Sequence, residues 1–326
     1  MSLEPYKFAK VVLIRSLSDL HPGTGRRGEI ADLAVQRDGF GFPVIYGSSI
    51  KGSIKTALYY RDRSLINLLG PEPDDVEKYS SPIAMMTSYL LSFPVRSLKG
   101  IYTNVTSPFL LKRFADYLDM ASILNTKYSE VAKSVKKIAD VSGKFLATTD
   151  FKSRHVVEGL EKAILCEEIS IDGDSIEERD EMNKLRELIG LDNPESLISL
   201  DDDKVKSLVE RSLIRVTRIR IDRDRRTVAE GGLWTEEAVP TRTVFTTVFL
   251  GYSKEYVKKY LKRLKEGLSE RKELKKLEEL KLKELEELEK HLENKEPIDV
   301  VLEKVRYLII GGDESIGRGI VELKEV

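Results

Sequence analysis

The sequence predicts an α+β protein in which the two ends of the chain pair within one sheet. Residues 6–15 (YKFAKVVLIR) form an apolar run typical of a buried strand, and residues 320–326 form another strand at the opposite end. Helical patterns occupy much of the chain between them. Strands at both termini with helices between favour this fold class. We find no internal repeat.

The N-terminal half alternates between short strands and helices. After the first strand and a Gly-rich loop (HPGTGRRG), a helical pattern runs from about Ser48 and is closed by Gly70-Pro71. Residues 83–95 are apolar and predict a central strand, and residues 96–108 predict a strand and a turn. Thr106 or Ser107 can cap the next helix, through Leu118, because Pro108 suits the first helical position.

The C-terminal half is predicted in the same way. The remaining helical patterns cover residues 120–152, 174–210 and 253–294, and the remaining strands cover residues 155–169, 213–222, 244–250 and 305–310. Residues 213–222 alternate arginine with β-branched side chains, which predicts one arm of a β-hairpin that returns through Val239. Leucines at 4-3-4 and 3-4 spacing in 253–294 predict two amphipathic helices, or one helix with a register shift.

The amino-acid composition limits the classes of protein to which this chain could belong. The 326 residues are 41 % apolar and 33 % charged, with Lys, Glu and Arg dominant, a balance that resembles proteins from hot environments. Cys166 is the only cysteine, so no internal disulfide forms and a reducing compartment is expected. We find no signal peptide and no apolar run near membrane-spanning length, so we expect a cytoplasmic protein without a membrane partner.

A net charge of −1 hides a strongly basic segment. Residues 211–226 contain seven arginines against two aspartates. Arg218, Arg220 and Arg223 suit a surface that follows phosphates, because a guanidinium offers several donors in a fork. A solvated edge strand, guarded by charge against aggregation, is the alternative.

Residues 38–61 (DGFGFPVIYGSSIKGSIKTALYYR) carry the most informative motif. Ser48 or Ser49 is expected to cap a helix, and Lys51 and Lys55 add positive charge near its N-terminus, an arrangement that binds anions. An ordinary capped helix with solvated lysines is the alternative. A nucleotide-binding P-loop is disfavoured, because the Lys-Ser/Thr pair after the second glycine is absent.

Four separated motifs, in matching order, resemble one family. They are HPGTG…GEIADLAVQRDGFGFPVIYGSSIKGSIK, SFPVRSLKGIYTNVTSPFLLKRF, RIRIDRDRRTVAEGGLWTEEAVP and the terminal GGDESIGRG. Together they are similar to the RAMP-superfamily backbone subunit of type III-B (Cmr-type) CRISPR effector complexes. The resemblance extends from the first strand to the last.

The resemblance implies a fold and partners. It implies a single RAMP domain over residues 1–326, with a ferredoxin-like (RRM-like) palm, a fingers region and a β-hairpin thumb at 211–240. Residues 253–296 are interpreted as a charged helical insertion. Copies would stack in a filament on a CRISPR guide RNA with other subunits of the complex. Each thumb would wedge into the guide–target duplex, and the single-stranded target RNA would be cut at each wedge.

The resemblance also implies catalytic residues. The cutting residue is the aspartate before the Gln-Arg pair, here Asp32, and family members carry a histidine in the N-terminal loop, here His21, and an acidic pair, here Glu236 and Glu237. The family commonly has an aromatic residue next, where this chain has Ala238. Asp32 could accept a proton or hold a divalent metal, which we expect to be Mg²⁺ recruited with the substrate phosphate. A carboxylate in salt bridges to neighbouring arginines (Arg26, Arg27 and Arg37) is the alternative for Asp32.

Further RNA contacts are expected along the four motifs. Arg37, Arg96, Lys99, Gly312 and Arg318 are candidates for the RNA backbone, the last two in a glycine loop whose amides could form an anion-binding nest. A tight connection between the last two strands is the alternative there. Trp234 could stack on a splayed base or serve as packing.

Two other functions stay open at this point. The first is an architectural RNA-binding filament subunit, with cutting done elsewhere in the complex. The second is a nucleotide-binding enzyme, which the missing P-loop lysine disfavours.

Overall fold

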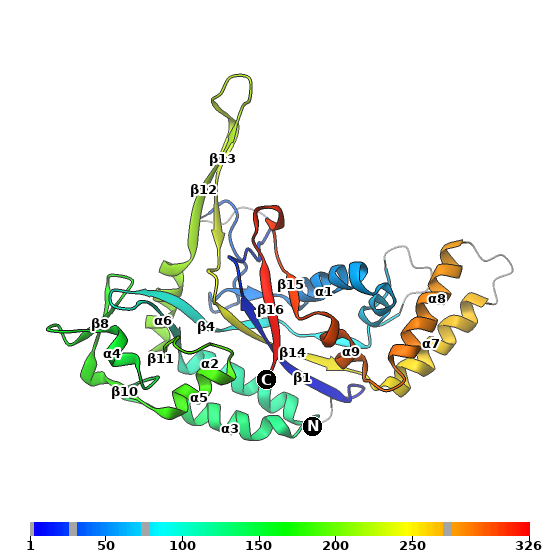
Figure 1. Ribbon diagram of the computed structural model, residues 1–326, viewed down its shortest axis with the longest axis horizontal. Coiled ribbons are helices and arrows are strands. Elements are labelled where there is room, and N and C mark those ends of the chain that lie inside the picture. The colour runs from blue at the N-terminus through cyan, green and yellow to red at the C-terminus, as the bar shows by residue number, and fades with distance from the viewer. Residues whose placement is uncertain (1–2, 26–30, 73–78, 270–275) are drawn as a thin grey trace.

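The computed structural model describes residues 3–25, 31–72, 79–269 and 276–326. In these ranges the chain forms one large, mostly antiparallel sheet with helices on both faces, and a two-stranded hairpin that rises far above it (Figure 1). The predicted α+β class is confirmed. None of the described helices is long and apolar enough to cross a membrane.

The strands of the large sheet are, in spatial order, β10 (Ile176–Glu178), β6 (Phe145–Ala147), β11 (Leu197–Ser199), β5 (Ile101–Thr106), β4 (Ser88–Ser97), β14 (Val244–Gly251), β1 (Phe8–Ser16), β16 (Ile320–Glu325) and β15 (Tyr307–Ile309). Five short strands join this path from the side: β2 (Val44–Ile45), β3 (Ile83–Met85), β7 (Val156–Val157), β8 (Lys162–Leu165) and β9 (Ile169–Asp172). The protruding hairpin consists of β12 (Ile214–Ile221) and β13 (Val228–Ala238).

Strand β1 lies at the centre of the sheet, as its continuous apolar run predicts. It pairs antiparallel with β14 on one side and with β16, the last strand of the chain, on the other. Val12 and Ile14 face one hydrophobic cluster, and Val11 and Leu13 face the other, following the two-residue period of a strand. The predicted pairing of the two ends of the chain is confirmed.

Nine α-helices and three short 3₁₀-helices are found in the described residues: α1 (Gly47–Arg61), η1 (Arg63–Leu69), α2 (Pro108–Ser122), α3 (Lys127–Ala139), α4 (Phe151–His155), η2 (Gly173–Ser175), α5 (Asp180–Leu188), α6 (Asp202–Ser212), α7 (Lys254–Ser269), α8 (Lys276–His291), α9 (Pro297–Lys304) and η3 (Glu314–Ile316). Helices α2, α3 and α5 cover one face of the sheet, below it in Figure 1. Side chains from α1, η1, α6, α7, α8 and α9 belong to the cluster on the opposite face.

The motif helix differs from its prediction in two ways. Helix α1 begins at Gly47, and its N-cap Tyr46 makes no side-chain capping bond, so the prediction that Ser48 or Ser49 caps it was wrong. Gly47 lies against β3, where a Cβ would be 2.1 Å from the carbonyl oxygen of Met85. The helix also ends at Arg61 and continues as the 3₁₀-helix η1, instead of running unbroken to Leu69.

The other differences between the predicted and the observed secondary structure involve short elements. Strands β6, β10 and β11 lie in stretches predicted to be helical, and α9 was not predicted. Each of these strands has three residues, which is too few for a period to show, and each exists because a neighbour supplies hydrogen bonds. The cap of α2 was predicted correctly, since the Ser107 hydroxyl accepts the N–H of Leu110 at 3.4 Å and Pro108 opens the helix.

The predicted pair of charged helices is present as α7 and α8, at the right of Figure 1. Their apolar side chains do not form a separate core. They are buried in the same hydrophobic cluster as side chains of α1 and η1. The buried residues of this region are Val257, Leu261, Leu268, Leu285, Leu288 and Leu292. An ion pair between Arg63 and Glu284 (2.9 Å) and a contact between His291 Nε2 and Asp62 Oδ2 (2.9 Å) join α8 to the region of η1. Although rich in charge, this helical pair is part of the main core.

Candidate functional site at the base of the hairpin

Asp32 lies on a short segment that runs along the base of β13. Leu33 donates its N–H to the carbonyl oxygen of Thr235 (3.0 Å) and accepts from the N–H of Glu237 (2.9 Å). The Asp32 carboxylate then accepts the N–H of Thr235 through Oδ2 at 2.9 Å. Its Oδ1 atom makes no hydrogen bond or ion pair with the residues that the structure describes. One carboxylate oxygen is therefore fixed on the hairpin, and no described residue binds the other.

The arginines predicted to flank Asp32 do not hold it. Arg26 and Arg27 lie outside the described residues, and Arg37 is bound elsewhere. Asp32 itself forms no ion pair within the described part of the chain. The salt-bridge interpretation of this carboxylate therefore receives no support from Arg37.

His21 is buried where three segments meet. Its Nδ1 lies 2.6 Å from the carbonyl oxygen of Glu237, and because a carbonyl only accepts, Nδ1 carries the proton. Its own carbonyl accepts the N–H of Gly312 at 3.0 Å. A Cβ on Gly23 would lie 2.5 Å from Nε2, and one on Gly311 would lie 2.2 Å from the His21 carbonyl. His21 thus joins the N-terminal loop, the hairpin and the C-terminal glycine loop.

Glu237 is fully buried and bound by two arginines. Its carboxylate accepts from Arg37 (3.0 and 3.2 Å), from the Nε of Arg215 (3.1 Å) and from the N–H of Val35 (3.3 Å). Burial alone would raise the pKa of Glu237, but the hydrogen bonds from Arg37 and Arg215 outweigh it and the pKa is lowered. Burial likewise opposes the charge of Arg37, and the bonds to Glu237 and Glu210 raise its pKa.

Glu236 is the centre of a second buried ion-pair group. Its carboxylate accepts from Arg218 (3.1 Å), from Arg318 (2.8 Å) and from the indole N–H of Trp234 (2.8 Å). Burial opposes ionisation here too, yet the bonds from Trp234 and Arg218 lower the pKa. Arg318 also pairs with Asp313 at 2.7 Å, which ties the C-terminal glycine loop to the hairpin.

The two glutamates predicted as catalytic therefore have their oxygens engaged by cations of the same chain. Several predicted RNA contacts, Arg37, Arg218 and Arg318, are the partners in these pairs. The amide of Gly312 donates to the His21 carbonyl, so the geometry supports the tight-connection interpretation of the glycine loop over the anion nest. The sequence does not reveal Arg215 and Glu210 as partners of Glu237 and Arg37, from which they are 22 and 173 residues away. Asp313 is only five residues from Arg318, but no regular pattern of the loop indicates that they pair.

We expect Glu237→Ala to lower the free energy of unfolding by about 3 kcal/mol, since it leaves Arg37 and Arg215 without their buried partner. The pKa of Glu237 is lowered from about 4.5, so its ionised form stabilises the folded chain above that pH. This contribution disappears as the pH falls through the lowered pKa. Urea unfolding at neutral and acidic pH measures both effects.

Glu210→Ala is the matched control, because Glu210 pairs with the same two arginines while remaining exposed. It should cost less than about 1 kcal/mol. Equal losses in the two variants would contradict the role given to the buried carboxylate.

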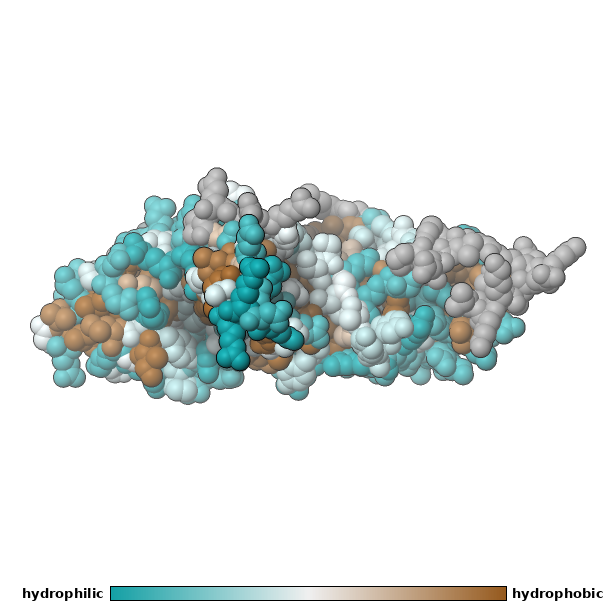
Figure 2. Space-filling view, turned by 90° about the horizontal axis from the view of Figure 1, so that it is seen from above, coloured by the Kyte–Doolittle hydropathy of each residue, from teal (hydrophilic) through white to brown (hydrophobic). Residues whose placement is uncertain are grey.

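The arginines at the tip of the hairpin are exposed and form no ion pair within the described structure. Arg220, Arg223, Arg225 and Arg226 are exposed, and the only hydrogen bond of their guanidiniums within the described structure is a long one, 3.5 Å, from Arg220 to the carbonyl of Glu230. Seen from above, the hydrophilic hairpin stands in front of the rest of the molecule (Figure 2). These guanidiniums are free to contact an external polyanion.

The other predicted RNA contacts lie on separate elements. Lys55 pairs with Glu72 at 2.7 Å, whereas Lys51 has no partner in the described residues, and burial followed by the charge of Lys55 lowers the pKa of Lys51. On β4 and its turn, Arg96 pairs with Glu167 (2.9 Å) and Lys99 donates to the Val156 carbonyl (3.0 Å). No contact joins these groups to Asp32 in the described part of the chain.

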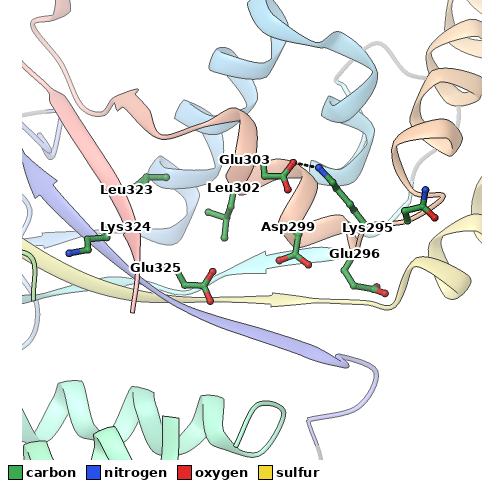
Figure 3. Close-up of a pocket in the computed structure, with 9 residues that line it drawn as sticks. Lys295, Glu296, Asp299, Leu302, Glu303, Leu323, Lys324 and Glu325 are labelled. Atoms are coloured by element: carbon green, nitrogen blue, oxygen red, sulfur yellow. Dashed lines mark hydrogen bonds and ion pairs between the residues drawn. The ribbon is translucent and has the colours of Figure 1, made fainter. Parts of the chain in front are cut away.

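A ready-made metal centre is absent from the described residues, which contain no group of three or more His, Cys, Asp or Glu able to hold an ion. A hollow of about 500 Å³ between α9 and β16 is rich in carboxylates (Figure 3), but Lys10 pairs with Asp299 and Glu325 there, and Lys295 pairs with Glu303. Among the described carboxylates at the hairpin base, Asp32 has an oxygen that no described residue binds and that could bind a hard cation, whereas Glu236 and Glu237 are engaged by arginines.

Fold and site together define a class: an α+β protein with one large sheet and a protruding, arginine-tipped hairpin that holds a carboxylate at its base. The chain belongs to the RAMP superfamily, whose model matches residues 13–322.

Individual relatives are similar over nearly the whole chain. The CRISPR system Cmr endoribonuclease Cmr4 of Pyrococcus furiosus is 30 % identical, with 98 % of this chain and 96 % of the relative covered. A chain in the cryo-EM structure of the type III-B Cmr-beta complex bound to cognate target RNA is 31 % identical, with a TM-score of 0.73 and 98 % of each chain covered. Oligomeric Cmr4 from Pyrococcus furiosus is 26 % identical, with a TM-score of 0.57 and 98 % of each chain covered.

Proposed function

We propose that this protein is a backbone subunit of a type III-B CRISPR effector complex, which binds guide RNA as part of a filament and cuts complementary target RNA at regular intervals. The similar proteins support each part: one is named an endoribonuclease, one is part of a complex bound to target RNA, and one is oligomeric. In this proposal the centre of the large sheet, around β14, β1 and β16, belongs to a ferredoxin-like palm, and β12 and β13 form the thumb.

One observation carries the catalytic part of the proposal. The Asp32 carboxylate is held by the hairpin itself through the N–H of Thr235, with Oδ1 available, while the neighbouring carboxylates of Glu236 and Glu237 are occupied by arginines. Asp32 is therefore the carboxylate best placed to act on an RNA that the hairpin contacts.

The reaction needs an oxygen nucleophile aligned with the leaving oxygen of the phosphodiester. The nucleophile is the neighbouring ribose 2′-hydroxyl or a water, and an A-form helix does not allow the 2′-hydroxyl to reach that alignment. A nucleotide displaced by the hairpin can be bent into it. Asp32 would then accept the proton of the nucleophile, which is the role of a general base.

A divalent cation is the other part of the proposal. Asp32 fits such an ion only as one ligand of several, so the remaining ligands would be phosphate oxygens and water. Bound there, the ion would stabilise negative charge on the phosphate.

The other predicted RNA contacts divide into two groups. Lys55, Arg37 and Arg318 form ion pairs within the chain and stabilise the fold. Lys51 remains a candidate contact for the RNA backbone.

The test is the cutting pattern of the complex assembled with guide RNA. End-labelled complementary RNA should give fragments of regular spacing, and non-complementary RNA should stay intact. Chelation by EDTA should stop cutting without releasing the target, and added Mg²⁺ should restore it. Persistent cutting in EDTA would refute the metal role, and a target that is bound but never cut would favour the architectural function.

We expect the exposed arginines of the hairpin tip to supply RNA affinity that does not depend on sequence. Replacing Arg223 and Arg225 by alanine should weaken binding of all single-stranded RNAs alike. The slope of log K against log salt should fall by about 0.7 for each phosphate that the variant no longer neutralises. Filter-binding titrations at several salt concentrations measure this slope.

Lys137→Ala is the control for charge, since Lys137 is an exposed cation on α3, on the far side of the sheet from the hairpin. An unchanged slope in the arginine variant, or the same change in the control, would show that the hairpin tip does not bind phosphates.

A further inference from the structure

An open hollow of about 640 Å³ lies between the loop after Arg37 and the first turn of α6. Its volume is in the range of about 300–1,000 Å³ seen for small-ligand sites. Its lining combines three chemical types: the aromatic rings of Phe40 and Phe109, the carboxylate of Asp203, and the ammonium of Lys206. The proposed cutting mechanism uses none of these side chains.

The loop that carries Phe40 is held in one conformation. Asp38 accepts the N–H groups of Phe40 (2.9 Å) and Phe42 (3.0 Å) through Oδ1, and its Oδ2 pairs with Arg113 at 2.6 Å. The Phe40 ring is nevertheless 60 % exposed, and its centroid lies 4.9 Å from that of Phe109 in an edge-on arrangement. A fixed and exposed aromatic face of this kind is suited to stacking.

Two charged side chains of the hollow are unpaired within the described structure, whereas Arg37, Asp38 and Asp202, which also line it, are bound to other groups. Lys206 and Asp203 are exposed and form no hydrogen bond or ion pair with the described residues. The stem of Lys206 passes close to Gly41, where a Cβ would lie 3.4 Å from its Cε atom. The hollow thus offers a cation, a carboxylate and a ring face within one site.

We propose that this hollow binds one unpaired nucleobase of single-stranded RNA, stacked on Phe40, with Lys206 contacting its phosphate and Asp203 accepting N–H groups from the base edge. Guanine fits best, because its Watson–Crick edge presents two adjacent N–H donors to the two oxygens of a carboxylate. This inference rests on the proposed RNA-binding function. An arginine of a neighbouring copy would also suit Phe40 and Asp203, but Lys206 would repel it and attracts phosphate.

The test compares two short oligouridines, one with a single guanosine and one with an abasic site in its place. In titrations of the full-length protein, Phe40→Ala should weaken binding of the guanosine RNA by roughly 10- to 100-fold, as expected for loss of one base–aromatic stack. Binding of the abasic RNA should weaken less, because only uracils remain to stack on Phe40. Phe40→Tyr should retain the affinity, and Asp203→Asn should reduce the preference for guanosine over uridine.

Leu160→Ala is the matched control, because Leu160 is also an exposed apolar residue, 55 % exposed, and lies outside the hollow. Equal losses for the guanosine and abasic RNAs, or no loss for either, would overturn the base site while leaving the proposed function intact. Loss of self-association in Phe40→Ala with unchanged RNA affinity would identify a second copy as the occupant. Failure of the unmodified protein to bind any RNA would refute both proposals.

Discussion

The Asp32→Asn variant, assembled with guide RNA and Mg²⁺, is expected to cut target RNA more slowly by roughly two to four orders of magnitude, the usual contribution of a general base. Target affinity should not fall, because a carboxylate repels phosphate and contributes nothing favourable to binding. The asparagine Oδ1 can still accept the N–H of Thr235, so the loop should keep its place on the hairpin. Single-turnover cutting and equilibrium binding, measured separately, distinguish these two effects.

Asp224→Asn is the matched control, since Asp224 is an exposed carboxylate at the tip of the same hairpin. It should cut at the normal rate. A normal rate in Asp32→Asn, or failure of that variant to assemble, would mean that Asp32 is structural and would favour the architectural function. We expect His21→Ala to slow cutting less and to destabilise the chain, because His21 joins three segments through its ring and its carbonyl.

Replacing residues 255–294 by a Gly-Ser linker is expected to abolish folding. The sequence favours a charged helical insertion here, but six of its apolar side chains, including Leu285 and Leu288, are buried with α1 and η1. Burial of each such side chain contributes roughly 1.5–3 kcal/mol. Their combined loss is comparable with the whole stability of a domain, about 5–15 kcal/mol. Circular dichroism and thermal unfolding of the purified variant measure the outcome.

A charge-only variant of the same helices is the control. Replacing Lys258, Lys259 and Lys262 by glutamine keeps the buried face of α7, and these lysines form no ion pair with α8 in the described structure. This variant should fold normally. A folded linker variant that binds RNA would instead show that the helical pair is an independent module.

The parts of the fold that follow from sequence are those with a long or repeated pattern. The apolar run of β1, the alternation of β12 and the leucine spacing of α7 and α8 each extend over enough residues to reveal their period. Strand β11 has three residues and owes its existence to pairing with β5 and β6, which no local pattern reports. The close approach of Gly47, at the start of α1, to the Met85 carbonyl is likewise a contact between distant segments.

For the candidate site too, some features follow from sequence motifs and others depend on contacts between distant segments. The position of Asp32 was predicted from motifs through a family resemblance, and its catalytic role stays a prediction. Whether Glu236, Glu237 and their arginines are buried in ion pairs depends on which charged side chains the fold brings into contact. The sequence shows that arginines and glutamates are abundant near the hairpin. It does not show that Arg37 and Arg318 pair with buried glutamates while Arg223 is exposed.

The bond from the Thr235 amide to the Asp32 carboxylate joins this proposed catalytic group to the hairpin. If the hairpin tilted against a bound RNA, the carboxylate would move with it and keep its offset from a nucleotide that the hairpin displaced. In a filament of identical copies, the interval between cuts would then equal the repeat of the hairpins along the RNA. Target length and filament length would set the number of products, whatever the base sequence at each cut.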